Sequence, residues 1–249
     1  MNSKIIAVIP ARYGSQRFPG KPLFPILGKP LIQHVWEGVS RCRGLSRILI
    51  ATDDEGIASA SRSFGAEVKM TRPDHPSGTD RISEAVQGLD ADWFLNIQGD
   101  EPLISDAVLN PFIESLGTFE MATLARRITR EEEIKSPNNV KVVFGGDGRA
   151  LYFSRSPIPY PRDGAGEYWL HLGIYAYRAG TLRRLVSLSP SPLENMEKLE
   201  QLRALENGIA IQVIPTSFHS VGVDTPEDVS IVEKLLLERA TQSQDKTHA

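Results

Sequence analysis

A short apolar run followed at once by a loop rich in glycine, proline and positive charge is the feature that most constrains this chain. Residues 5–10 read IIAVIP, a β-branched run with the length and composition of a buried strand. Two glycines and two prolines follow between residues 14 and 22, and they exclude a regular helix or strand there. The sequence therefore predicts a rigid loop at the carboxyl end of the first strand.

Three cations lie in this loop: Arg12, Arg17 and Lys21. The first acidic residue of the chain is Glu37, so no neighbour in sequence cancels their positive field. Such a loop suits a polyanion, for example a nucleoside triphosphate. The alternative interpretation is a solvated basic loop without a ligand, because Lys and Arg are mostly surface residues.

Two familiar phosphate loops are excluded by spacing. A Walker loop places four residues between its glycines and a Ser or Thr after the Lys, whereas five residues separate Gly14 from Gly20 and Pro22 follows Lys21. The dinucleotide fingerprint G-x-G-x-x-G is also absent after this strand. If the loop binds phosphates, it does so in another way.

Length and charge narrow the class of protein. With 249 residues, the chain can bury a substantial core as one domain, or as one domain with an inserted lobe. Its net charge of −3 argues against a nucleic-acid or membrane-surface protein, which would carry a basic excess. Cys42 is the single cysteine, so no intrachain disulfide can form. The sequence lacks a secretory signal and a membrane-length apolar run, which makes the cytoplasm the expected location.

Apolar strands and amphipathic helices alternate along the first half of the chain. After the loop, residues 30–42 have helical periodicity, 47–53 read as a second strand that ends in acid, and 67–71 read as a third. This alternation predicts parallel pairing with right-handed crossovers. The fold class is therefore α/β, in which ligands bind at the carboxyl ends of the strands.

The apolar residues 93–97 predict a central strand, and the glycine that ends it leaves Asp100 and Glu101 at its carboxyl edge. Mg²⁺ takes one or two carboxylates together with waters and phosphate oxygens, so Asp100 is a metal candidate. The alternative is an ordinary turn acid. A D-x-D motif begins at Asp90, but it precedes the strand and is expected at the opposite edge of the sheet.

Two polar segments read as helix starts. In RPDHPSGTDR, either Ser77 or Thr79 could cap a helix, and the exposed amides there could also bind an anion. In GVDTPED, a capping arrangement around Thr225 accounts for every polar residue except Asp224. We therefore assign Asp224 as the second carboxylate of a metal pair with Asp100.

A change of composition predicts an inserted antiparallel lobe at about residues 138–178. Two β-rich runs flank the turn at residues 145–148, which is a strong hairpin signal. The Pro-rich stretch 157–161 carries an aromatic side chain and could form a subunit interface.

The end of the chain is predicted to be largely helical. Residues 191–208 have a cap, a proline at the first turn and a glycine stop, which predicts one helix. The polar residues 241–249 are expected to form a disordered tail behind a single domain of residues 1–240. His171 lies on a predicted strand, where a lone histidine is usually structural.

Together these segments resemble the CMP-Kdo synthetase (3-deoxy-manno-octulosonate cytidylyltransferase) family. The matching motifs run in family order from residue 5 to about residue 237: IPARYGSQRFPGKPL, RPDHPSGTDR, NIQGDEPLI, NNVKVV, YFSRSPIP, HLGIYAYR, LEQLR and GVDTPED. The resemblance implies a Rossmann-like nucleotidyltransferase fold with a mostly parallel central sheet and a small inserted antiparallel dimerisation lobe. It also implies a homodimer.

The resemblance further implies that CMP passes from CTP to the anomeric hydroxyl of 3-deoxy-D-manno-octulosonate (Kdo), giving CMP-Kdo and pyrophosphate for lipopolysaccharide biosynthesis. Such a transfer depends on positioning and charge neutralisation, with Mg²⁺ as cofactor. The catalytic residues are then Arg12, Arg17, Lys21 and Asp100, and the metal ligands are Asp100 and Asp224. CTP would contact Ala11, Arg12, Gly14, Ser15, Lys21, Ser77, Gly78 and Thr79. Kdo would contact Arg81, Gln98, Arg155, His171, Tyr175, Glu200 and Gln201.

Related activities stay open at this point. The acceptor could be sialic acid or 8-amino-Kdo; FPGKPL favours Kdo over sialic acid, whereas the amino analogue differs by one substituent and changes few pocket contacts. From a different class, a non-catalytic nucleotide-binding subunit would bind CTP without releasing pyrophosphate. A glycosyltransferase would instead transfer sugar from a UDP or GDP donor.

Overall fold

The chain folds into two compact units of structure. The computed structural model describes residues 3–14, 18–164 and 166–247. The first unit consists of Ile6–Gly88, Ile97–Leu109 and Ser220–Ala249, and the second contains Leu89–Asn96, Asn110–His219 and the start of the chain. One of the boundaries between them falls within helix α4 (Asp106–Ser115). No helix in the described ranges is long and apolar enough to cross a membrane.

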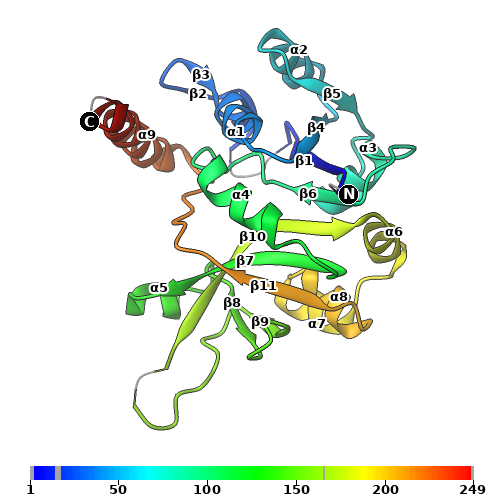
Figure 1. Cartoon of the computed structure of the whole chain (residues 1–249), viewed down its shortest axis with the longest axis vertical. Helices are drawn as coiled ribbons and strands as arrows, with labels where there is room; N and C mark the ends of the chain where they lie inside the picture. Colours follow the sequence, from blue (N-terminus) through cyan, green and yellow to red (C-terminus); the bar gives the residue numbers. More distant parts are fainter. Residues whose placement is uncertain (1–2, 15–17, 165, 248–249) are drawn as a thin grey trace. The chain divides into compact units, whose positions relative to one another are not determined.

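The first unit is built on three neighbouring strands in the order β1, β4 and β5, of which β4 and β5 are parallel (Figure 1). Helix α2 packs against β4 and β5, while α1 and α3 contact β4. The predicted first strand is buried almost throughout, because its apolar side chains are covered on both faces. The elements of this unit are β1 (Ile5–Ala11), η1 (Lys21–Leu23), β2 (Pro25–Ile26), β3 (Lys29–Pro30), α1 (Leu31–Ser40), β4 (Leu45–Thr52), α2 (Glu55–Ser63), β5 (Glu67–Met70), α3 (Gly78–Ala85) and α9 (Pro226–Thr247).

Side-chain caps fix where two helices of the first unit begin. At α3, the hydroxyl oxygen of Ser77 accepts a hydrogen bond from the Asp80 amide at 3.1 Å. At α9, the Asp228 carboxylate accepts from the amides of Asp224 and Thr225 at 2.9 and 2.8 Å. Both predicted capping arrangements are confirmed. The cap of α9 also holds the backbone of Asp224 and leaves its carboxylate to other partners.

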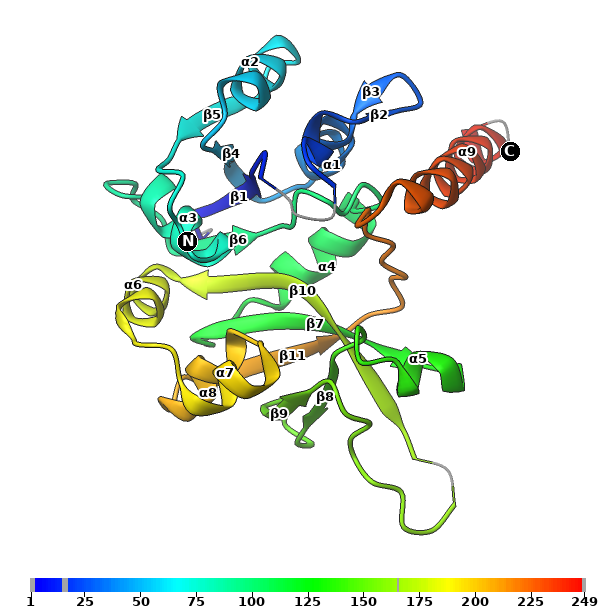
Figure 2. The same cartoon turned by 180° about the vertical axis from the view of Figure 1, so that it is seen from behind.

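The second unit is built on a mixed sheet in the order β11, β7, β10 and β6 (Figure 2). Strand β11 runs parallel to β7, whereas β10 is antiparallel to both β7 and β6. The hairpin of β8 and β9 joins β10 through the antiparallel pairing of Lys141 with Leu170. The elements are β6 (Trp93–Asn96), β7 (Met121–Ile128), α5 (Glu131–Lys135), β8 (Lys141–Phe144), β9 (Ala150–Ser154), β10 (Tyr168–Arg178), α6 (Ala179–Ser187), α7 (Pro192–Glu197), α8 (Gln201–Glu206) and β11 (Ile211–Pro215).

The predicted α/β class is confirmed, and so is the hairpin. The antiparallel strands β8, β9 and β10 all fall within the predicted lobe of residues 138–178. In the hairpin turn, Gly148 has a φ of 78°, and a Cβ there would lie 2.1 Å from Nε2 of Gln212. Only glycine fits such a position without strain. That the lobe forms a dimer, and that residues 1–240 act as one domain, stay predictions.

The helix predicted over residues 191–208 is divided in two. Helix α7 ends at Glu197, Lys198 takes a left-handed conformation with φ 55°, and α8 begins at Gln201. The carbonyl oxygens of Glu197 and Lys198 accept hydrogen bonds from the side chain of Arg155. Tertiary contacts of this kind override local helix propensity, so the prediction of a single helix was wrong.

The last helix is longer than the sequence predicts. Helix α9 continues to Thr247, whereas a tail was expected from residue 241. Helix propagation adds one hydrogen bond for each residue fixed, so a polar segment can extend an existing helix without apolar contacts.

Candidate active site

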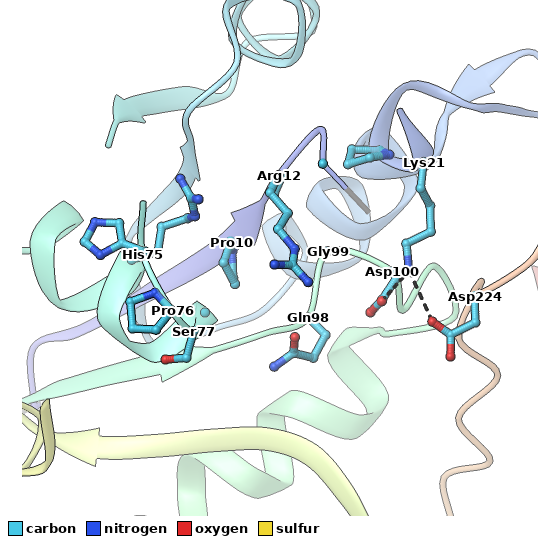
Figure 3. Close-up of a pocket in the computed structure, with 15 residues that line it drawn as sticks. Pro10, Arg12, Lys21, His75, Pro76, Ser77, Gln98, Gly99, Asp100 and Asp224 are labelled. Carbon is cyan, nitrogen blue, oxygen red and sulfur yellow. Dashed lines mark hydrogen bonds and ion pairs between the residues drawn. The ribbon is translucent and has the colours of Figure 1, made fainter. Parts of the chain in front are cut away.

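A cavity of about 580 Å³ lies in the first unit, among the segments that follow β1 and β5, the turn after Ile97 and the segment before α9 (Figure 3). Many of the residues selected from sequence line it together: Ala11, Arg12, Gly14, Lys21, Ser77, Gly78, Arg81, Gln98, Asp100 and Asp224. Thr79 is buried and, among the described residues, does not belong to this lining. Ser15 and Arg17 lie outside the described residues. The sequence motifs thus converge on one concave site.

At one end of the cavity, a lysine lies between two carboxylates. Lys21 Nζ is 2.7 Å from Asp100 Oδ2 and 3.4 Å from Asp224 Oδ1, and the Lys21 side chain is 11% exposed. These residues come from η1, from the turn after Ile97 and from the segment before α9 (Figure 3). Residues more than 200 positions apart in sequence therefore form one charged cluster.

The pair of carboxylates fits a divalent cation. Both acids converge on a single positive group, and Mg²⁺ in phosphate chemistry takes one or two carboxylates with water and phosphate oxygens as its other ligands. No cluster of three or more His, Cys, Asp or Glu side chains suited to a metal occurs in the described ranges. The two carboxylates alone therefore do not form a closed protein cage around a cation.

Close backbone packing holds Asp100 in place. A Cβ on Gly99 would lie 2.7 Å from the Pro10 carbonyl oxygen, so the turn can approach β1 only because this residue is glycine. The Val223 amide donates to the Asp100 carbonyl oxygen at 2.9 Å, which ties the two carboxylate-bearing loops together. The spacing of the two acids is thus set by main-chain contacts.

Glu101 is a third acid beside this pair. Burial raises its pKa to about 7, and the charges of Asp100 and Asp224 act in the same direction. The hydroxyl of Ser220 donates a hydrogen bond to Glu101 Oε2, which opposes the rise. A carboxyl group with a raised pKa therefore lies next to Asp100 in the chain.

The start of α3 forms the opposite end of the cavity. Ser77 and Gly78 line it at the helix N-terminus, where exposed amides favour anions. Arg81 lies one turn later and is buried. Its Nη1 donates to Thr71 Oγ1 at 2.6 Å and lies 3.4 Å from Asp53 Oδ1, so Arg81 already has protein partners.

Arg12 lies between these two ends. It follows β1 directly and is exposed. Figure 3 shows its guanidinium pointing toward Gln98, in the middle of the cavity. A cation in this position faces the space between the helix N-terminus and the carboxylate cluster, where an extended anion would pass.

The second unit holds its own polar group, formed by β10 and the start of α8. The rings of His171 and Tyr175 lie 5.3 Å apart, and Glu200 is close enough to raise the pKa of Tyr175, although burial is the larger cause. Within the described part of the chain, Nε2 of His171 and Nε2 of Gln201 are buried without a hydrogen-bond partner. Buried donors or acceptors that lack a partner are costly, so these two atoms are available to hydrogen-bond a bound molecule.

His171 is kept neutral by its surroundings. Burial beside Phe153 and Tyr175 lowers its pKa to about 3 from the ordinary 6.5. A neutral imidazole can donate or accept a hydrogen bond at Nε2, but it cannot neutralise a carboxylate. Any role of His171 is therefore in hydrogen bonding.

This burial predicts a pH dependence of stability. Between pH 6.5 and pH 3 the unfolded chain binds a proton at residue 171 that the folded chain does not. The contribution of His171 to the free energy of unfolding therefore falls on acidification by up to about 1.4 kcal/mol for each pH unit. Urea unfolding between pH 7.5 and pH 4 should show a shallower loss of stability in His171→Gln than in the parent. His219→Gln, which replaces an exposed histidine, is the control. If the free energy of unfolding falls equally steeply with pH in His171→Gln and in the parent, the burial argument is contradicted.

The cytidylyltransferase family model matches residues 6–211, most of the chain. This chain belongs to the cytidylyltransferase family. The predicted family and enzyme class, a nucleotidyltransferase, are thereby confirmed.

Relatives of this cytidylyltransferase match it over nearly its whole length. A 3-deoxy-manno-octulosonate cytidylyltransferase of Geobacter metallireducens is 48% identical over 248 residues, which cover 93% of this chain and 98% of that protein. An 8-amino-3,8-dideoxy-manno-octulosonate cytidylyltransferase of Shewanella oneidensis is 50% identical over 241 residues, with coverage of 93% and 98%. A solved structure of CMP:2-keto-3-deoxy-manno-octonic acid synthetase complexed with CTP is similar with a TM-score of 0.89 and 43% identity, covering 95% of this chain and 100% of that chain.

Sequence reasoning missed some residues of the cytidylyltransferase that the structure brings to attention. His75 and Gly99 line the cavity, and His75 pairs with Glu84 on α3. Gly99 had a signal, since a glycine that ends a strand marks close backbone approach. No local sequence signal marks the place of His75 in the cavity or the burial of Glu101, because both depend on contacts between distant segments.

Proposed function

We propose that this cytidylyltransferase transfers CMP from CTP to the anomeric hydroxyl of Kdo, releasing pyrophosphate. The anomeric oxygen forms a bond to the α-phosphorus, the bond from that phosphorus to the pyrophosphate oxygen breaks, and the hydroxyl proton passes to water. The named relatives at 48% and 50% identity act on Kdo or its 8-amino analogue, which supports this class of acceptor.

The observation that carries the proposal is the convergence of Asp100 and Asp224 on the Lys21 ammonium, in a cavity that also presents Arg12. A nucleotidyl transfer needs cations around the triphosphate and carboxylates that hold its metal. A sugar-binding module would need neither. The same arrangement favours an enzyme over a subunit that only binds nucleotide.

The chain's own residues have distinct roles in this reaction. Asp100 and Asp224 would hold Mg²⁺, which when bound supplies Lewis-acid polarisation of the phosphate oxygens. Arg12 binds the triphosphate and balances the charge of the leaving pyrophosphate, and Arg17 is proposed to act with it. Lys21 neutralises the two carboxylates and is proposed to bind a phosphate oxygen of the nucleotide as well.

The nucleotide is held at the first turn of α3 and along the basic loop. Ser77 and Gly78 supply the helix N-terminus, and Ala11 and Gly14 supply backbone at the end of β1. We keep Ser15 and Thr79 as proposed contacts of CTP and Arg81 and Gln98 as proposed contacts of the acceptor.

The polar group of the second unit is proposed to bind the acceptor. The Nε2 atoms of His171 and Gln201, which lack partners among the described residues, would hydrogen-bond sugar hydroxyls, together with Tyr175 and Glu200. Because burial lowers the pKa of His171, we propose that it contacts the acceptor by hydrogen bonding.

The acid that the enzyme accepts is a finer question. Kdo and its 8-amino analogue differ by one substituent, and the relatives named for each are almost equally similar to this chain. We propose Kdo as the acceptor and the amino analogue as the second candidate.

Pyrophosphate release tests the function. CTP, ATP, GTP and UTP are each offered with Mg²⁺ and with Kdo, 8-amino-Kdo, sialic acid or no acceptor. Release with CTP and an octulosonate alone supports the proposal and identifies the acid. No release with any pair, from protein shown to be folded, would leave only the nucleotide-binding subunit.

We also propose a homodimer that works in the cytoplasm, where CTP is available. The support for a dimer is exposed apolar surface in the second unit: Tyr160 is 86% exposed within the Pro-rich stretch, and Leu151 is 65% exposed. Light scattering at micromolar concentration is expected to give twice the chain mass of 27.5 kDa. Tyr160→Asp is expected to shift the mass toward the monomer, and a parent that is already monomeric would contradict the proposal.

A further inference from the structure

A fully buried lysine side chain in the second unit has no part in the proposed chemistry. Lys141 lies at the start of β8 and is 0% exposed. Its Nζ donates to three carbonyl oxygens: those of Ser136 at 3.0 Å, Asn139 at 2.6 Å and Arg155 at 2.5 Å. An ammonium has three N–H donors, and here each has a main-chain acceptor. A buried charge is costly, so this lysine must hold something that an apolar residue could not.

Arg155 continues the chain of contacts. Its Nε donates to the Glu197 carbonyl oxygen at 2.8 Å, its Nη1 to that of Pro137 at 3.0 Å and its Nη2 to that of Lys198 at 3.4 Å. The Arg155 amide also donates to the Glu197 carboxylate at 3.0 Å. The guanidinium carries three nitrogens in one plane and can reach acceptors that lie too far apart for the single nitrogen of a lysine.

Two acceptors of Arg155, the carbonyl oxygens of Glu197 and Lys198, lie at the break between α7 and α8. Lys198 is left-handed there, a conformation that costs energy for a residue other than glycine and persists only when the surroundings hold it. The break sets the direction of the next turn, and that turn carries Glu200 and Gln201. Without it, the favourable helix pattern of residues 191–208 would run on and carry both side chains to other faces.

We propose that Lys141 and Arg155 form a brace that fixes the α7–α8 break and so positions Glu200 and Gln201 for the acceptor sugar. They are positioning residues, and Arg155 acts through the Lys198 turn instead of touching the sugar acid. This inference rests on the proposed function in one respect, namely that Glu200 and Gln201 bind the acceptor.

Steady-state kinetics separate this role from direct contact. In Arg155→Met and in Lys141→Met, the KM for the acceptor is expected to rise about tenfold with the KM for CTP within about twofold, because only the acceptor group is displaced. The double variant should cost little more than either single one, since both changes release the same turn. Arg155→Lys keeps the positive charge but loses the planar guanidinium. Its KM for the acceptor should therefore rise as much as that of Arg155→Met. Recovery in Arg155→Lys would overturn the brace in favour of a charge contact.

A matched control is an arginine of α6 that contacts the far end of α8. Arg184 donates from Nη2 to the Asn207 carbonyl oxygen at 2.7 Å, at the other end of α8. Arg184→Met removes an arginine-to-carbonyl bond without touching the break, and it should leave both KM values unchanged. An equal rise in Arg184→Met would show that any loosening of α8 has the same effect, which would overturn the specific role of the break.

A readout without substrate separates this proposal from the proposed function. Hydrogen exchange by mass spectrometry of residues 196–206 should be faster in Arg155→Lys and Arg155→Met than in the parent and in Arg184→Met. This expected difference in exchange rate does not depend on which acceptor the enzyme uses, because no substrate is present. If exchange rises but no octulosonate is used, the brace stands and the assigned substrate fails. If exchange in both Arg155 variants equals that of the parent, the brace is refuted. The two Arg155 variants are sufficient for this test, so it does not depend on whether Lys141→Met folds.

Discussion

Asp100→Asn is expected to lower turnover by two or more orders of magnitude while leaving the fold intact. Asparagine matches aspartate in shape, so the turn after Ile97 and its contact with Val223 are kept. The change removes the negative charge of one of the two carboxylates that now pair with the Lys21 ammonium and that are proposed to hold Mg²⁺. Metal-assisted phosphoryl transfer depends on such ligands, so most of the rate should be lost. The measurement is turnover over a range of Mg²⁺ concentrations, with thermal unfolding as the check on folding.

Asp90→Asn provides the matched control for this prediction. Asp90 belongs to the D-x-D motif, its side chain is 95% exposed, and it pairs only loosely with Lys4 at 3.2 Å. Its replacement should leave turnover unchanged. Near-normal turnover of Asp100→Asn at saturating Mg²⁺ would remove Asp100 from the metal site, and a loss in Asp90→Asn would revive the D-x-D motif as the functional one.

Arg12→Ala is expected to lower turnover by about two orders of magnitude and to weaken CTP binding as well. Its guanidinium faces the middle of the cavity at the carboxyl end of β1 (Figure 3), where it meets charge that grows as pyrophosphate leaves. A contact that strengthens in the transition state appears in turnover, whereas a contact made equally in both states appears only in affinity. We predict the first kind of effect for Arg12, and the same for Arg17→Ala.

The control for Arg12 is an arginine of the same unit that is absent from the cavity lining among the described residues. Arg47 pairs with Glu67 across β4 and β5 and is about half exposed. Arg47→Ala should change neither turnover nor CTP affinity, since an exposed ion pair contributes little. If Arg12→Ala alters CTP affinity alone, Arg12 is a binding residue and the charge argument for the leaving group fails.

The first unit could be predicted in good part because its signals are local. The β-branched run of β1, the cap at Ser77 and the cap before α9 depend on neighbours in sequence, and each has a direct physical reading. The pairing of Asp100 with Asp224 was also within reach, because Asp100 follows a strand and Asp224 precedes a helix that could both be assigned from the sequence. The strand-end rule selected Asp100, and the cap of α9, which accounts for its other polar residues, selected Asp224.

The rest depended on contacts that no local pattern carries. The break at Lys198 contradicts a strong helix pattern and exists because Arg155 holds the adjacent carbonyls. The burial of Glu101 and the neutral state of His171 follow from tertiary packing alone. That Lys21 bridges two carboxylates was also unexpected, since its sequence context indicated only a phosphate ligand.

Phosphorus NMR of a reaction containing CTP, Kdo and Mg²⁺ tests the central claim most directly. We predict that the CTP signals are replaced by those of one phosphodiester, CMP-Kdo, and an equal amount of pyrophosphate, and that omission of Kdo stops the change. Pyrophosphate with free CMP would mean that water, and not the sugar, attacks the α-phosphorus. Unchanged CTP with folded protein and every candidate acid would contradict nucleotidyl transfer altogether.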